Sequence, residues 1–129
     1  FNENYVFQND YSVDKCMNRI YDFYQSNRKI TAFFCFSDLM AIGTMSGLLQ
    51  KGFHIPQDFS IVGFDNIKAS SYFYPPITTV DQDIESLGNI ASSLLHEALN
   101  SLEMIPQRVI NKTNLILRES TASLRQTNG

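Results

Sequence analysis

Polar side chains that could bind a ligand follow four strand-like stretches of the sequence. They are Asp10 and Tyr11, Ser37 and Asp38, Asp65 and Asn66, and finally Gln82. Carboxylates and amides exchange hydrogen bonds with vicinal hydroxyl groups, and an aromatic ring can stack on the apolar face of a sugar or on a base. A phosphate would instead call for Lys, Arg or a glycine-rich loop. The set therefore favours a neutral polyhydroxylated ligand.

Each of these residues also has a purely structural interpretation. Ser37 and Asp38 could be helix caps, because serine and aspartate are preferred at that position. Asp65 could form an Asx turn, and Tyr11 could be ordinary packing. Gln82 counts only as part of the set. The sequence leaves both interpretations open.

The sequence contains no recognisable catalytic or metal-binding motif. His54 and His96 have no cysteines or carboxylates at ligand spacing. Residues 43–47, GTMSG, differ from a nucleophile elbow because the serine is one place too late. A GxGxxG fingerprint and a P-loop are also absent. We therefore expect no enzymatic activity, no metal and no cofactor.

The size and charge of the chain restrict its partners. Its 129 residues are enough for a single unit or a fragment. A net charge of -3 argues against nucleic-acid binding by this part, since phosphate contacts need a dense cationic surface. Cys16 and Cys35 are too few for a disulfide framework, which favours a reduced, cytoplasmic setting. We expect no membrane anchor, because no apolar stretch is long enough to span a bilayer.

The apolar pattern predicts alternating strands and helices. Strands are expected over 5–8, 31–36, 59–64, 77–80, 108–111 and 113–118. Helices are expected after a Ser12 cap over 13–24, over 39–50, over 68–74 and from 84 to 99. Apolar strands separated by helices are typical of an α/β fold, here a three-layer α/β/α sandwich with a mainly parallel sheet. Ligands bind beyond the carboxyl ends of such strands, where the polar set lies.

The helix over 39–50 is apolar around much of its circumference. Met40, Ile42, Met45 and Leu48 occupy more of it than one sheet face can cover. Either the helix is buried on two sides or it meets a partner. The aromatic residues at 72–74 favour a self-association surface nearby, and core packing is the competing interpretation.

Four ordered motifs resemble signatures of the lactose/galactose-repressor (LacI/GalR) family of bacterial transcription regulators. They are TAFFCFSDLMAIG at 31–43, GFHIPQDFSIVGFDN at 52–66, PPITTVDQ at 75–82 and LREST at 117–121. The resemblance covers the later part of that family's effector-binding region, which has the type I periplasmic-binding-protein-like fold. Members have two subdomains joined by three crossing segments, and an N-terminal DNA-binding domain. Effector in the cleft changes the angle between the subdomains of a dimer.

The resemblance implies a domain organisation. Residues 1–121 are expected to form the C-terminal part of an effector-binding and dimerisation domain, and 122–129 a flexible tail. The helix over 84–104 would cross to the other subdomain, which this chain lacks, and the chain would return near 105–111. Operator DNA would be bound only through a missing N-terminal domain.

The resemblance also assigns roles to single residues. Tyr11 corresponds to the aromatic residue that stacks on effector, Asp65 to the carboxylate that binds it, and Gln82 to a polar position beside the hinge. Ser37 stands where several members place a polar contact, often asparagine, so its reach is shorter. Asp38 completes the expected effector site. The expected dimer interface comprises Ile42, Met45, Tyr72 and Phe73.

The expected function is therefore effector sensing in a cytoplasmic transcriptional repressor that forms a homodimer and binds a small molecule, a sugar by the chemistry above. An extracytoplasmic sugar-binding protein of the same fold is the alternative. An enzyme of flavodoxin-like architecture is a third, less favoured hypothesis.

Overall fold

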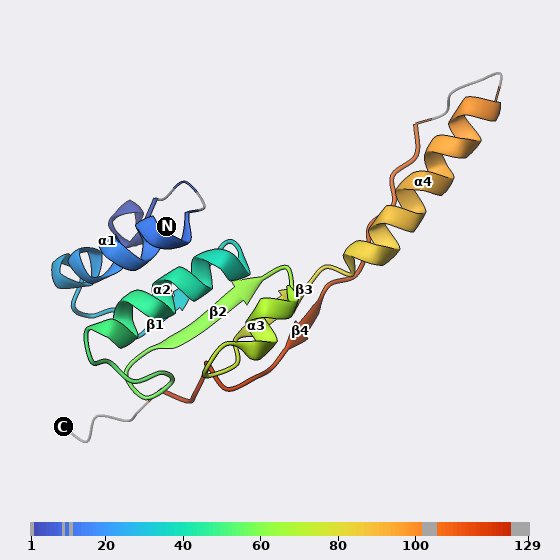
Figure 1. Ribbon diagram of the computed structural model, residues 1–129. Coiled ribbons are helices and arrows are strands. Elements are labelled where there is room, and N and C mark those ends of the chain that lie inside the picture. The colour runs from blue at the N-terminus through green and yellow to red at the C-terminus, as the bar shows by residue number, and fades with distance from the viewer. Residues whose placement is uncertain (1, 9, 11, 102–105, 125–129) are drawn as a thin grey trace.

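The structure is a computed structural model that describes residues 2–8, 10, 12–101 and 106–124 (Figure 1). Its elements are η1 (Glu3–Tyr5), α1 (Val13–Ser26), β1 (Ala32–Phe34), α2 (Asp38–Gln50), β2 (Ser60–Phe64), α3 (Lys68–Tyr72), β3 (Thr78–Asp81), α4 (Ile84–Asn100) and β4 (Asn114–Ile116).

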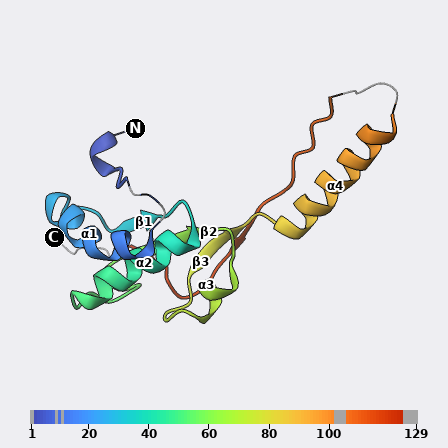
Figure 2. The same cartoon turned by 45° about the horizontal axis from the view of Figure 1, so that its top comes forward.

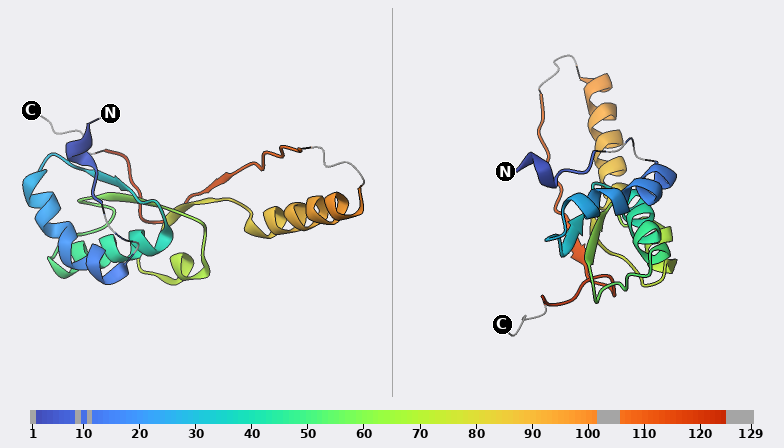
Figure 3. Two further views of the ribbon diagram at one scale, coloured as in Figure 1. Left: turned by 90° about the horizontal axis from the view of Figure 1, so that it is seen from above. Right: turned by 90° about the vertical axis from the view of Figure 1, so that its left-hand side faces the viewer.

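The four strands form one sheet in the order β1-β2-β3-β4. β1 pairs with β2, and β2 with β3, in parallel, whereas β4 is antiparallel to β3. Helices α1, α2 and α3 lie on one side of this sheet (Figures 1 and 3). Phe33 packs against the core on that side, and its neighbour Phe34, on the other face, is 67% exposed. The α/β class with a mainly parallel sheet is confirmed, and the described residues supply one helical layer of the expected sandwich.

Two predicted strands are absent from the described residues. Residues 3–5 form a 3-10 turn because the Asn2 side chain accepts a hydrogen bond from Asn4 N at 3.0 Å. Phe7 then packs on Phe23 of α1, with ring centroids 5.1 Å apart, so this apolar stretch serves packing rather than sheet pairing. The predicted strand over 108–111 is also wrong, since pairing with β3 begins only at Asn114.

Helix α2 is buried from two sides, by the sheet and by α1. Two glycines one turn apart permit the close approach of α1. A Cβ at Gly43 would overlap Val13 O, and a Cβ at Gly47 would overlap Met17 O. Met45 is fully buried in the core, so its prediction as a dimer-interface residue is corrected. The circumferential apolar pattern of α2 is explained by packing within one chain.

We expect Gly47→Ala to lower the free energy of unfolding by about 1–3 kcal/mol, the usual cost of overpacking a well-packed contact. The methyl group would meet the backbone of α1, which cannot move aside as a side chain could. Gly88→Ala is the matched control, because that helical position has open space around it. Alanine there should raise stability by up to about 1 kcal/mol. Urea denaturation of both variants measures the difference, and equal effects would contradict the close approach.

Helix α4 extends away from the sheet (Figures 1 and 2) and buries no residue. It nevertheless carries an apolar stripe, in which Ile84 is 57% exposed, Leu95 61% and Leu99 77%. None of the described helices combines the length and hydrophobicity that crossing a membrane requires.

The end of the chain returns along the sheet. Ser60 Oγ and the backbone of Ala122 exchange hydrogen bonds of 3.2 and 3.1 Å. Most of the tail predicted to be flexible, residues 125–129, lies outside the described residues. The domain boundaries given above stay a prediction.

Candidate functional site

The parallel pairing places the carboxyl ends of β1, β2 and β3 at one edge of the sheet. The predicted polar residues follow these ends: Ser37 and Asp38 within four residues of β1, Asp65 and Asn66 directly after β2, and Gln82 directly after β3. Helices α1 and α2 also begin toward this edge (Figure 1).

Asp65 and Gln82 are in direct contact at this edge. Gln82 Nε2 donates a hydrogen bond of 2.7 Å to Asp65 Oδ1, and both residues are half-buried. Asp65 has φ 103° and Asn66 φ 53°, in a region that residues other than glycine rarely adopt. Such a backbone persists only where its surroundings hold it. One of these restraints is the 2.9 Å bond from Asp65 N to Val80 O.

Asp38 is enclosed beneath this loop, with no exposed surface. Its Oδ2 accepts from Ile67 N at 2.9 Å, and its Oδ1 accepts from Thr79 Oγ1 at 2.5 Å. A Cβ on Gly63 would overlap the carboxylate, so glycine leaves the space that Asp38 fills. This geometry contradicts the expected direct contact with effector. Asp38 supports the loop over 65–67 instead.

Arg118 holds the same loop from its other side. Its Nη2 donates to Asn66 Oδ1 at 2.6 Å, and its Nη1 donates to Ser70 Oγ at 3.1 Å and to Ile77 O at 2.7 Å. The sequence analysis included this residue in a motif but assigned it no role. The available signal was a cation directly after the three apolar residues 115–117.

Ser37 caps α2, because its Oγ accepts a hydrogen bond from Met40 N at 3.3 Å and its φ of -152° is non-helical. The capping interpretation is therefore confirmed. A hydroxyl group that accepts one hydrogen bond can still donate another, so capping is compatible with a ligand contact.

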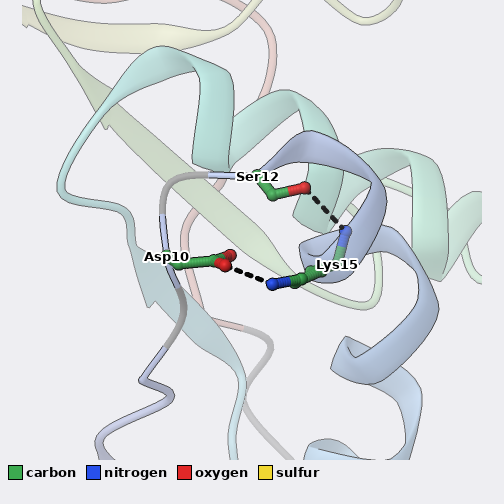
Figure 4. Close-up of polar contacts among 3 residues, drawn as sticks. All are labelled: Asp10, Ser12 and Lys15. Atoms are coloured by element: carbon green, nitrogen blue, oxygen red, sulfur yellow. Dashed lines mark hydrogen bonds and ion pairs between the residues drawn. The ribbon is translucent and has the colours of Figure 1, made fainter.

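Tyr11 lies outside the described residues, and its neighbours define the start of α1 (Figure 4). Ser12 caps the helix by accepting from Lys15 N at 3.3 Å. Asp10 forms an ion pair with the Lys15 ammonium group. The hydrogen bond from Lys15 holds the pKa of Asp10 below its ordinary value.

The expected interface residues differ in exposure. Tyr72 is 82% exposed at the end of α3, whereas Ile42 and Phe73 are half-buried and pack against the core. Unlike Met45, all three keep some accessible surface.

Two other features of the described residues do not belong to this edge. Cavities of about 570 and 510 Å³ are lined by residues near the amino ends of the strands, among them Pro56 and Gln57, and neither includes Asp65 or Gln82. No group of three or more His, Cys, Asp or Glu suited to a metal occurs in the described part of the chain. The edge thus offers oxygen and amide groups for hydrogen bonding.

Comparison with known proteins places this arrangement in a family. Residues 2–121 match the model of the periplasmic binding protein-like domain. The chain belongs to this family. Within it, the chain is similar to the HTH-type transcriptional repressor PurR of Aliivibrio salmonicida, with 34% identity over 119 residues, 87% of this chain and 36% of the repressor. The chain thus spans about a third of the length of the curated relatives it matches.

Solved structures in this family carry the same fold. The complex of the transcriptional regulator CelR with cellobiose has a TM-score of 0.86 at 28% identity, over 93% of this chain and 37% of CelR. A LacI family regulator from Enterococcus faecalis with bound ribose has a TM-score of 0.86 at 29% identity, over 92% of this chain and 44% of that one. These relatives are transcription regulators. The resemblance to the lactose/galactose-repressor family and the periplasmic-binding-protein-like fold are confirmed.

Proposed function

We propose that this chain is the effector-sensing part of a cytoplasmic transcriptional repressor whose effector is a neutral sugar. The observation that carries the proposal is the contact between Asp65 and Gln82 at the carboxyl edge of the parallel strands. A carboxylate and a primary amide side by side can accept from one hydroxyl group and donate to the next, as a vicinal diol requires. The two relatives solved with cellobiose and ribose support the same ligand class.

The charge of this edge favours a ligand without phosphate. The carboxylates of Asp65, Asp81 and Asp83 lie at or just after strand ends. Among the described cations on this side, Arg118 is engaged by Asn66, Ser70 and the carbonyl of Ile77, and Lys15 at the start of α1 is paired with Asp10. An anionic ligand would meet more negative than positive charge here, whereas the hydroxyl groups of a neutral sugar would not.

The remaining parts of this function depend on the whole protein. The ligand would be enclosed between this subdomain and a second one, and DNA would be bound by another domain. Tyr72, Ile42 and Phe73 would contribute the accessible part of a homodimer interface. The sheet edge described here would form one wall of the cleft.

A thermal-shift screen of the full-length protein tests the ligand class. We expect ribose, cellobiose or another neutral mono- or disaccharide to raise the melting temperature, because a ligand at 100 times its Kd stabilises the folded state by about 2.7 kcal/mol. The matching sugar phosphates should not do so. The proposal would be contradicted if only sugar phosphates raised the melting temperature, or if no neutral sugar did.

We expect Ile42→Asp to dissociate the homodimer, since an unpaired carboxylate at an interface costs about 3 kcal/mol or more, which raises the dimer Kd more than hundredfold. Sedimentation velocity of the full-length protein measures the change. Tyr72→Asp should act in the same way without disturbing the core, because its ring is 82% exposed in the single chain. A dimer that persists in both folded variants would remove these residues from the interface.

A further inference from the structure

Two segments connect the sheet to α4, and one asparagine holds them together. Residues 81–83 lead out of β3 into α4, and the chain comes back through Asn111 before β4. Asn111 Nδ2 donates to Gln82 O at 3.0 Å and, at 3.5 Å, to Asp83 O. Asn111 is half-buried at this crossing.

Hydrogen bonds within the outgoing segment, residues 81–83, and to the first turn of α4 hold its conformation. Asp83 N donates to Asp81 Oδ1 at 2.9 Å, and Asp83 has φ 51°. Asp83 Oδ1 caps α4 by accepting from Ser86 N at 3.1 Å, while Asp83 O accepts from Leu87 N at 3.0 Å. The first turn of α4 is therefore fixed to the backbone that Asn111 holds.

The described chain constrains α4 only in part beyond its first turn, since Ile90 and Leu94 are half-buried. The helix buries no residue, so packing against the sheet does not orient it. The returning segment is joined to the outgoing one through Asn111, while sheet pairing on that side begins only at Asn114. The crossing at residues 81–83 and 111 is thus the joint between sheet and helix.

Gln82 belongs both to this joint and to the candidate site. Its side chain donates to Asp65 Oδ1, and its backbone carbonyl accepts from Asn111. We propose that Asn111 is a positioning residue that clasps the two crossing segments, and that Gln82 couples this clasp to Asp65. A ligand hydroxyl group that donates to Asp65 Oδ1 would share this oxygen with the Gln82 amide, so the candidate site and the clasp meet at Gln82. Only this last step rests on the proposed function.

The clasp can be tested without ligand by the distance between two spin labels in the full-length protein. Ser26→Cys in α1 and Ser93→Cys in α4 place labels on exposed positions at either side of the joint. Cysteines outside this chain are replaced by serine. Cys16 and Cys35 are buried, and burial raises the pKa of the Cys35 thiol to about 12, so labelling at neutral pH is selective. Dilution with unlabelled subunits removes distances between protomers.

We expect Asn111→Ala and Asn111→Asp to shift or broaden the distance distribution by roughly 2 Å or more, because Ser93 lies about 14 Å along the helix from its start and amplifies a small rotation. Asn111→Asp keeps the shape but removes the donor. Asn100→Ala is the matched control, since its Nδ2 donates to His96 O within α4 and joins no second segment of the described residues. Unchanged distances in both Asn111 variants, or an equal change in the control, would overturn the clasp, even if the melting temperature fell.

Gln82→Ala tests the coupling to Asp65. It keeps the backbone carbonyl that Asn111 binds and removes the side chain that binds Asp65. A change in the distance distribution supports the coupling, whereas a wild-type distribution would overturn it and leave only the clasp. These results are independent of the sugar screen. A negative screen with altered Asn111 distances would reject the proposed ligand while the clasp stands.

Discussion

Replacing Asp65 by alanine in the full-length protein should weaken effector binding by about 1.5–3 kcal/mol, the range for a hydrogen bond to a charged group. This corresponds to a roughly 10- to 150-fold increase in Kd. The reason is the position of the carboxylate at the end of β2, where Gln82 orients one of its oxygens. Isothermal titration calorimetry with the sugar found by thermal shift measures the loss.

Two further variants make this result specific. Asp65→Asn keeps an acceptor for Gln82 and should lose less affinity than Asp65→Ala. Asp58→Ala removes a carboxylate that binds His54 N at 2.7 Å near the amino ends of the strands, away from the candidate site. We expect its affinity to match the wild type. An unchanged Kd in Asp65→Ala would remove Asp65 from the site.

Asp38→Ala should lower the stability of the protein more than Gly47→Ala does. Its buried carboxylate accepts two hydrogen bonds, from Ile67 N and Thr79 Oγ1, and each is worth about 1.5–3 kcal/mol because the acceptor is charged. We therefore expect a fall of about 3–6 kcal/mol in the free energy of unfolding, measured by urea denaturation.

Comparison with milder variants separates this effect from loss of charge in general. Asp38→Asn keeps one acceptor and should retain part of the stability. Asp22→Ala removes an exposed carboxylate from α1 and should change stability by no more than about 0.5 kcal/mol. If Asp38→Ala were as stable as the Asp22 variant, the carboxylate would not support the loop.

The elements with strong local signals could be predicted from the sequence. Ser12 caps α1 as expected, and the continuous apolar stretches at 31–36 and 59–64 contain β1 and β2. The stretch at 5–8 has the same β-prone composition but no strand beside it, so strand propensity alone misassigned it. The strand predicted over 113–118 is longer than β4, which covers Asn114–Ile116, because pairing with β3 rather than strand propensity sets its ends.

The candidate site was predictable where it follows from topology. Because ligands bind beyond the carboxyl ends of parallel strands, the sequence predicted that Asp65 and Gln82 lie together although they are 17 residues apart. Asp38 was assigned to the effector site because it follows a strand as the other residues do, and the sequence does not show that Gly63 leaves a buried space for its carboxylate. Arg118 and Asn111 bind partners 52 and 29 residues away, and no local pattern records such contacts.

The exposed apolar stripe of α4 has a consequence for how sensitivity could evolve. Leu95 and Leu99 find no covering surface among the described residues, so only a surface beyond these residues could remove them from water. That helix starts two residues after Gln82, which binds Asp65. We therefore expect substitutions in any surface that packs on α4 to affect the candidate site through the start of this helix, without changing Asp65 or Gln82.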